Sequence, residues 1–253
     1  MARYFISIGR IFCVMLQKTE GIVFRTIKYS ETSVVTHIYT RHFGLLSFIV
    51  PGVRTSKAKR NKAGMLQPMS MLEMDIYHKE TANLLRLKDY RNNYLYQSLP
   101  FDVVKTTIGF FYTDILTHVI REQEPNEALY LFIVHAYVEL DQANGNLALM
   151  PQRFLLKLST HLGFQPENNY SPDRNLFDMS EGSFSNVPVR LMSGMPQDVS
   201  LVFHRFLSDP DSPLAFTHEQ RRQLLSYMLE YYKLHVSNFG DMKSVRVLED
   251  VLS

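Results

Sequence analysis

The hydrophobic pattern of this chain changes period once, near Tyr90, and this change constrains the fold more than any other feature. Before it, apolar and polar residues alternate, as in "SMLEMDIYHK" (70–79), where Leu72, Met74 and Ile76 share one face. After it, apolar residues recur every three or four positions. A period of two is typical of half-buried strands, and a period near 3.6 is typical of amphipathic helices. The sequence therefore predicts a β-rich part followed by a helical part.

Five strands are expected in the first part of the chain. Their ranges are 21–29, 33–40, 45–50, 70–79 and 82–90. These segments are rich in β-branched and aromatic residues, and a short turn closed by Gly44 joins the second to the third as a hairpin. Five short strands in about seventy residues suit a small antiparallel barrel such as the OB-fold better than a sandwich.

Helices are expected in the second part. They run up to Pro125, over 127–142, from Pro151 to Gly163, over 198–208, and from a capping box at Thr217 and Gln220 to Val236. Residues 165–196 are rich in Asn, Ser, Pro and Asp, which predicts an inserted loop. The predicted fold class is α+β, with a barrel domain at 15–90 and a mostly helical domain at 91–253 that contains the insertion.

The chain end and the cysteine content bear on the compartment. Residues 1–14 carry Arg10 inside an apolar stretch and lack a small-residue cleavage site, so we expect a disordered extension ahead of Met15. Cys13 is alone, which excludes an internal disulfide and a zinc site built from several thiolates. No apolar run is long enough to span a bilayer. We therefore expect a cytoplasmic protein without a membrane segment.

Positive charge is concentrated near the start of the chain. Residues 1–80 hold 12 Lys and Arg against 5 Asp and Glu, although the whole chain has a net charge of only +2. The run "GVRTSKAKRNKAG" (52–64) has no acidic residue and contains Arg54, Lys57, Lys59, Arg60 and Lys62. Cations on a loop between two barrel strands could hold nucleic-acid phosphates, with help from Arg41 in the neighbouring hairpin. Tyr39, Phe43 and Phe48 are candidates for stacking on bases. The alternative is a solvated loop.

Motifs of enzymes are absent. There is no phosphate-binding loop and no GxGxxG after a strand. His118 with Glu122, and His135 with Glu139, are spaced to share a metal on a helix, but each pair lacks further ligands. The sequence thus favours a binding protein over an enzyme and predicts no metal or cofactor.

One stretch carries a family resemblance. Residues 29–68 resemble the RecO family of bacterial DNA repair and recombination mediators, through Tyr29, Glu31, Thr40, Gly44, the Gly52–Arg54 segment ahead of the basic run, and Gly64 before "LQP". The segments "RFLLKLSTHLGF" (153–164) and "DMKSVRVLEDVL" (241–252) are similar to later parts of that family.

The resemblance implies an OB-fold and a helical domain that bind single- and double-stranded DNA and anneal complementary strands. It also implies partners: RecR, the acidic C-terminal tail of single-strand-binding protein (SSB), and indirectly RecA, which is loaded onto SSB-coated strands. Many members hold zinc through four cysteines in the central insertion, but residues 165–196 contain none. Arg153, Phe154 and Lys157 match the region that docks the SSB tail, and Gln152 stands where a second Arg is expected.

Two other functions fit the charge pattern. An RNA-binding OB-fold protein of RNA metabolism would show the same basic run, and a preference for DNA over RNA would separate the two. A scaffold with an incidental basic loop would keep its interactions after charge reversal in that loop. The leading hypothesis is a nucleoid-associated, DNA-binding recombination mediator without catalytic turnover.

Overall fold

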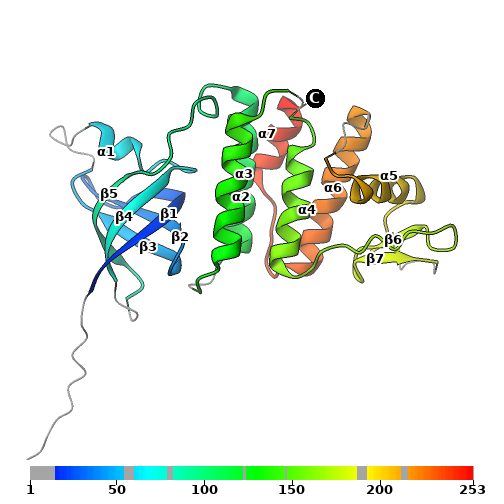
Figure 1. Ribbon diagram of the computed structural model, residues 1–253, viewed down its shortest axis with the longest axis horizontal. Coiled ribbons are helices and arrows are strands. Elements are labelled where there is room, and N and C mark those ends of the chain that lie inside the picture. The colour runs from blue at the N-terminus through cyan, green and yellow to red at the C-terminus, as the bar shows by residue number, and fades with distance from the viewer. Residues whose placement is uncertain are drawn as a thin grey trace, which may run out of the picture. The chain divides into compact units, whose positions relative to one another are not determined.

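The computed structural model describes residues 15–53, 60–78, 82–121, 124–145, 147–186, 193–211 and 216–252. Contacts divide the chain into two units, which we describe separately (Figure 1). The barrel unit comprises Met1–Tyr94 with Gln123–Pro125, and the helical unit comprises Leu95–Glu122 with Asn126–Ser253. The predicted extension at residues 1–14 lies outside the described residues.

The strands of the barrel unit close into a barrel in the order β1-β2-β3-β5-β4. They are β1 (Met15–Lys28), β2 (Val34–Thr40), β3 (Gly44–Val50), β4 (Met71–His78) and β5 (Leu85–Asn92). β3 and β5 pair in parallel, and the other neighbouring strands pair antiparallel. This topology confirms the predicted small barrel of the OB type. A short helix that was not predicted, α1 (Arg60–Gly64), lies between β3 and β4.

Alternate side chains of the strands fill the barrel. Leu72, Met74 and Ile76 of β4 are buried, as their period of two predicts. The next residue, Tyr77, points outward and has 37% of its surface exposed. The outward positions therefore remain available for ligands.

Gly44 closes the β2–β3 hairpin with a positive φ of 64°, which a residue without a Cβ adopts readily.

The three aromatic candidates for stacking on bases lie in the barrel core or pack against it. Tyr39 and Phe48 are buried, so neither offers a ring face to a ligand. Phe43 packs against the barrel core and stacks on His78, with ring centroids 4.3 Å apart. The sequence could not reveal this, because the period alone does not say which face of a closed barrel is inside.

The helical unit contains six helices among its described residues. They are α2 (Val103–Val119), α3 (Glu127–Gln142), α4 (Met150–Leu162), α5 (Gln197–Ser208), α6 (His218–His235) and α7 (Lys243–Val251). The predicted capping box is present, since Thr217 Oγ1 accepts from the Gln220 N–H and the Gln220 side chain accepts from the Thr217 N–H. Gly163 ends α4 in the left-handed region, with a φ of 82°. Helix α7 was not predicted.

The prediction that the first helix continues to Pro125 is wrong. Helix α2 ends at Val119, and Ile120 follows in extended conformation with its side chain buried. Arg121 then donates from Nη2 to the Asn238 carbonyl oxygen at 2.8 Å. Burial of Ile120 and this hydrogen bond favour an exit from the helix before the proline.

The inserted segment at 165–196 forms a small hairpin, where the sequence predicted only a loop. Its strands are β6 (Leu176–Asp178) and β7 (Ser183–Ser185). Phe177 and Phe184 are buried, and the Phe177 ring lies 4.7 Å from Phe203 of α5 and 5.9 Å from Tyr231 of α6. Aromatic packing therefore holds this hairpin against the helices.

No helix within the described ranges has the length and hydropathy that a membrane span requires.

Candidate functional site

A groove of about 650 Å³ opens on the outside of the barrel, where the end of β3 meets the start of β5. We call it the barrel groove. The parallel pairing places Ile49 beside Arg86, and the β4–β5 pairing places Tyr77 opposite Arg86. The groove is lined by Val50, Pro51, Gly52, Val53, Lys62, Tyr77, Arg86, Leu87, Lys88 and Tyr90.

Strand β5 supplies two cations to this groove. Leu85 and Leu87 point into the core, so Arg86 and Lys88 alternate with them and point outward. Both are exposed, and neither forms an ion pair with a carboxylate in the part of the chain that the structure describes. An unpaired cation gives up no internal partner when it binds an anion.

Lys62 of α1 adds a third cation, which has a partner. Its Nζ donates to Asp89 Oδ1 at 2.6 Å and lies 5.2 Å from the centre of the Tyr90 ring. The hydrogen bond from Lys62 lowers the pKa of the Asp89 carboxyl group. Both side chains are largely exposed. Exposed pairs of this kind contribute only about 0–1 kcal/mol, so a phosphate can replace Asp89 at Lys62.

The predicted basic run begins and ends at the barrel groove. Gly52 and Val53 line the groove on one side of the run, and Lys62 lines it on the other. Arg54, Lys57 and Lys59 lie outside the described residues, and Arg60 begins α1 with a side chain that is likewise outside them. Of the predicted DNA-binding residues, the structure thus places Lys62 in the groove.

Arg41 is not brought to the barrel groove. It follows β2, at the hairpin end where Thr40 pairs with Gly44, whereas the groove lies at the other end of β3, at Val50. At about 3.3 Å per residue these ends are separated by about 20 Å. Arg41 also donates from Nη1 to Glu20 Oε2 at 3.0 Å, and both side chains are half-buried.

A surface of mixed charge adjoins the barrel groove. Asp75 of β4 pairs in register with Asp89 of β5, and like charges in that arrangement repel each other. Glu73, next along the outer face of β4, is held by Arg91 at 2.5 Å between Oε2 and Nη2. Lys18, which pairs in register with Asp75, and Arg91 line the same surface, so it carries both signs of charge, and the Lys62–Asp89 pair marks its border with the barrel groove.

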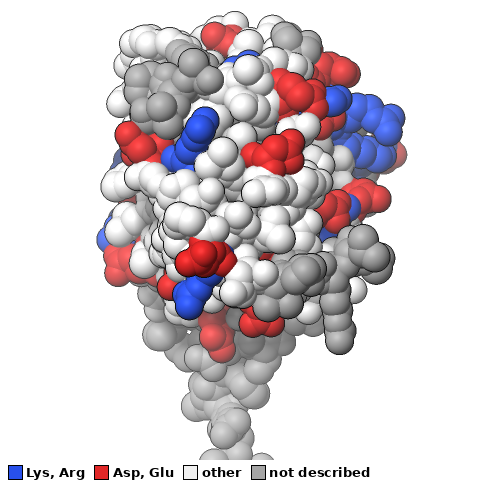
Figure 2. Space-filling view, turned by 90° about the vertical axis from the view of Figure 1, so that its right-hand side faces the viewer, with Lys and Arg blue, Asp and Glu red and all other residues white. Residues whose placement is uncertain are grey.

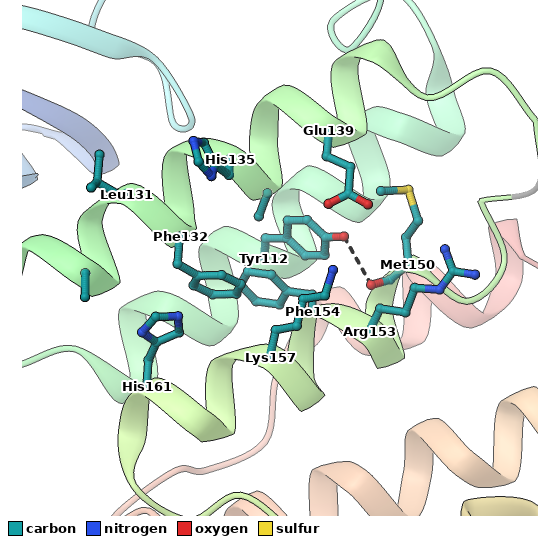
Figure 3. Close-up of a pocket in the computed structure, with 12 residues that line it drawn as sticks. Tyr112, Leu131, Phe132, His135, Glu139, Met150, Arg153, Phe154, Lys157 and His161 are labelled. Atoms are coloured by element: carbon teal, nitrogen blue, oxygen red, sulfur yellow. Dashed lines mark hydrogen bonds between the residues drawn. The ribbon is translucent and has the colours of Figure 1, made fainter. Parts of the chain in front are cut away.

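The helical unit has a second groove, of about 470 Å³, between α3 and α4 (Figure 3). We call it the helical groove. Its floor is aromatic: the Phe154 ring stacks on Tyr112 at 3.9 Å and on Phe132 at 5.6 Å, and Phe132 also stacks on His161 at 4.7 Å. Tyr112 is fixed by donating its hydroxyl to the Met150 carbonyl oxygen at 3.2 Å. Burial raises the pKa of Tyr112, so this hydroxyl stays protonated at neutral pH.

Charged side chains border this aromatic floor. Arg153 and Lys157 are on α4, one turn apart, and His135 and Glu139 are on α3 (Figure 3). Lys157 is exposed and forms no ion pair with any described carboxylate. Burial lowers the pKa of His161, which therefore favours the neutral ring. The predicted residues Arg153, Phe154 and Lys157 all line the helical groove.

Arg153 already has partners within the chain. Its Nε donates to the Pro210 carbonyl oxygen at 2.6 Å and lies 3.8 Å from Asp211 Oδ1. The Arg153 side chain is only about one-fifth exposed, whereas that of Asp211 is 70% exposed. A carboxylate from solution must therefore compete with Asp211 for Arg153.

Gln152 lies away from the helical groove. It is buried and donates from Nε2 to the Arg221 carbonyl oxygen at 2.9 Å. Its Oε1 has no hydrogen-bond partner among the described residues. Gln152 lines a different pocket, with Arg221 and Arg222, and takes no part in the lining of the helical groove.

Two smaller pockets also carry charged side chains. One, of about 30 Å³, is lined by His218, Arg221 and Arg222 together with Leu225, Leu248 and Leu252. The other, of about 180 Å³ on the barrel, is lined by Lys18, Arg91, Glu73, Asp75 and Asp89. In the described parts of the chain, no three His, Cys, Asp or Glu residues are grouped so that they could hold a metal ion. At the end of the helical unit that carries α5 and the β6–β7 hairpin, basic and acidic side chains are interspersed (Figure 2).

Comparison with known proteins shows to which family the chain belongs. The model of the N-terminal part of recombination protein O matches residues 15–93, and the model of its C-terminal part matches residues 100–187. The DNA repair protein RecO of Phocaeicola vulgatus is 32% identical over 244 residues, which cover 94% of this chain and 100% of the relative. The chain belongs to the RecO family. RecO proteins of Flavobacterium psychrophilum (32% identical) and Bacteroides fragilis (30%) match 93% and 94% of the chain, and each is covered to 99%.

Membership in the RecO family assigns the chain to DNA repair. The lining of the barrel groove falls within the range of the N-terminal RecO model, and that of the helical groove within the range of the C-terminal model. Sequence reasoning missed Arg86, Lys88 and Tyr77 as candidate ligand contacts. The alternation in "LLRLKDY" (84–90) marks Arg86 and Lys88 as outward-facing, and this signal was available.

Proposed function

We propose that this RecO-family protein is a DNA-binding recombination mediator in which the barrel groove holds the DNA backbone. The observation that carries the proposal is that Arg86 and Lys88, which form no ion pair with a described carboxylate, lie in a groove where the basic run begins and ends. Phosphate contacts of this kind release counterions and bind without regard to sequence. We include Arg54, Lys57, Lys59, Arg60 and Lys62 among the proposed DNA contacts. Arg41 is left out because Glu20 holds it at the far end of β3.

For the helical groove we propose a protein ligand, the acidic C-terminal tail of SSB. Its aromatic floor suits an apolar side chain, and Lys157 is available for a carboxylate. Charge-assisted hydrogen bonds to carboxylates are among the stronger polar contacts. With DNA in one groove and SSB in the other, the protein would act on SSB-coated strands.

The finer activities follow from this arrangement and from the family. Annealing requires two strands whose phosphate repulsion is screened, which the cations of the barrel groove and of the basic run would supply. RecR, and RecA indirectly, are proposed as partners on family membership alone. Nothing in this scheme requires catalytic turnover.

The test is a fluorescence anisotropy titration of labelled single-stranded DNA over a series of salt concentrations. The double variant Arg86→Gln/Lys88→Gln removes two proposed phosphate contacts, so the slope of log K against log salt should flatten by about 0.7 × 2, or about 1.4. The matched control is Lys243→Gln/Arg246→Gln, which removes the same charge from exposed positions of α7. Equal slopes in the two variants would refute a DNA path through the barrel groove. The same titration with RNA of identical sequence tests the alternative of an RNA-binding protein.

A further inference from the structure

Tyr77 stands at an unusual place on the barrel. It is an aromatic residue on the outer face of β4, where the preceding outward positions are Glu73 and Asp75. The register places it between Leu16 of β1 and Arg86 of β5. Leu16 and Arg86 are also exposed, so the three form a row across neighbouring strands.

The Tyr77 side chain has no hydrogen-bonding or aromatic partner among the described residues. It lines the barrel groove. Tyr90, the other tyrosine of the groove, is buried and donates its hydroxyl to the Lys62 carbonyl oxygen at 3.1 Å. Tyr77 is therefore the aromatic side chain of this groove whose ring is available to a ligand.

We propose that Tyr77 is a stacking platform for an unpaired base and that it gives the barrel groove a preference for single-stranded over duplex DNA. This inference rests on the proposed DNA binding at the same groove. A base stacked on Tyr77 has its sugar–phosphate next to Arg86, which is the cross-strand neighbour of Tyr77, and the following phosphate can reach Lys88 two residues along β5. Stacking on an aromatic ring tolerates any base, because every base has a π face.

The carboxylates at the edge of the barrel groove also favour single-stranded over duplex DNA. Asp75 and Asp89 form the next outward-facing pair, two residues along β4 from Tyr77 and, across a register shift at Lys88, three residues along β5 from Arg86, at a distance of roughly 7 Å. A single strand has one row of phosphates, which can follow the cations. A duplex has a second row about 6 to 12 Å away across a groove. There the carboxylates of Glu73, Asp75 and Asp89 outnumber the cations of Lys18 and Arg91 and would repel it. Bases paired inside a duplex are also unavailable to Tyr77.

The chain contains no tryptophan, which permits a direct test. The variant Tyr77→Trp introduces a single indole whose emission should be quenched by single-stranded oligonucleotide, less by the same oligonucleotide with abasic sites, and little by duplex. Phe110→Trp is the control reporter, since Phe110 is exposed on α2 of the helical unit. Its emission should not change.

Affinity measurements complete the test. Tyr77→Ala should weaken binding of single-stranded DNA about 10-fold, within the range of base–aromatic stacking, and should leave the affinity for abasic DNA and for duplex within about two-fold. Its salt slope should equal that of wild type, because no phosphate contact is lost. Tyr77→Phe should restore wild-type affinity.

The outcomes separate the inference from the proposal on which it rests. Normal DNA binding that depends on Arg86 and Lys88, with no quenching of the indole in Tyr77→Trp and equal losses for single strands and duplex in Tyr77→Ala, would overturn the stacking role alone. DNA binding that is insensitive to Arg86 and Lys88 as well as to Tyr77 would overturn both.

Discussion

The barrel groove and the helical groove both combine cations with aromatic side chains, but they integrate them differently into the fold. In the barrel groove, Arg86 and Lys88 have no described carboxylate partner, and the Tyr77 ring is exposed. In the helical groove, Arg153 is hydrogen-bonded to Pro210, and the Phe154 ring is buried between Tyr112 and Phe132. The side chains that the barrel groove offers to a ligand, Arg86, Lys88 and Tyr77, thus lie outside the hydrophobic core, whereas Phe154 of the helical groove belongs to it.

Because of this difference, ligand binding and folding stability can be changed independently at one groove but not at the other. Side chains on the outer face of a strand can be replaced with little effect on stability, so DNA binding should be separable from folding. A ligand of the helical groove instead binds to side chains that also hold helices together. Selection on that groove is therefore also selection on the stability of the helical unit.

The largest expected effect is on stability. Phe154→Ala should lower the free energy of unfolding by about 3–5 kcal/mol, because it removes a buried ring and leaves a cavity. Tyr77→Ala should change it by no more than about 0.5 kcal/mol. Urea unfolding followed by circular dichroism measures both. Similar losses for the two variants would show that the contrast between the grooves is mistaken.

A second prediction concerns the carboxylates at the edge of the barrel groove. Asp89→Asn frees Lys62 and removes one of the carboxylates that repel phosphates, so single-stranded DNA should bind up to about 5-fold more tightly. If Lys62 gains a phosphate, the salt slope should steepen by about 0.7. The salt titration checks both numbers, and Asp173→Asn, an exposed position in the helical unit, controls for net charge. Weaker binding by Asp89→Asn would mean that Asp89 positions Lys62 for DNA instead of competing with it.

A smaller effect is expected from the internal competitor in the helical groove. Asp211→Asn should strengthen binding of a synthetic peptide with the C-terminal sequence of SSB by about 2- to 3-fold, because the carboxylate nearest Arg153 loses its charge. The Nε bond to Pro210 remains, which limits the gain. Isothermal titration calorimetry at low salt measures the change. An unchanged affinity would indicate that Arg153 takes no part in peptide binding.

The smallest effect is a pH dependence of stability. Burial lowers the pKa of His161 below 6.5, so below that pH the unfolded chain binds a proton that the folded chain resists. The stability due to neutral His161 is complete above pH 6.5 and is lost as the pH falls toward its folded-state pKa. His161→Gln should therefore lose less stability than wild type between pH 7 and pH 5, as measured by urea unfolding. An identical pH profile would show that His161 does not contribute.

Most of the barrel could be predicted because its strands alternate clearly. The exception is the first half of β1, which starts at Met15, whereas the prediction began at Gly21. Its residues include Gln17, Lys18 and Glu20, whose polar side chains leave only a weak periodic signal. Register with β4, a strand about fifty residues later, determines that this half is a strand. Such non-local pairing is invisible to a local pattern.

The helical unit was predictable where helices are long and capped. The bounds of α3 were predicted to the residue, whereas α7, which has nine residues and buries only Leu248, was missed although Val245, Leu248 and Leu252 recur at helical spacing. Strands β6 and β7 have three residues each. Such short elements depend on packing against partners that are distant in sequence.

The candidate sites could be predicted only in part. The sequence marked the basic run and Arg153, Phe154 and Lys157, which the structure brings together in the helical groove. It could not show that Arg86 adjoins the basic run, because this depends on the parallel pairing of β3 with β5. Nor could it show that Arg41 lies at the opposite end of β3.

The most direct test of the account is to measure two ligands against two variants. Labelled single-stranded DNA and the SSB tail peptide are each titrated with Arg86→Gln/Lys88→Gln and with Lys157→Ala. We expect a crossed result, in which the barrel variant loses DNA affinity and keeps its affinity for the peptide, and the helical variant loses peptide affinity and keeps its affinity for DNA. Loss of both ligands in the same variant, with the other variant unaffected, would contradict the assignment of separate ligands to the two grooves.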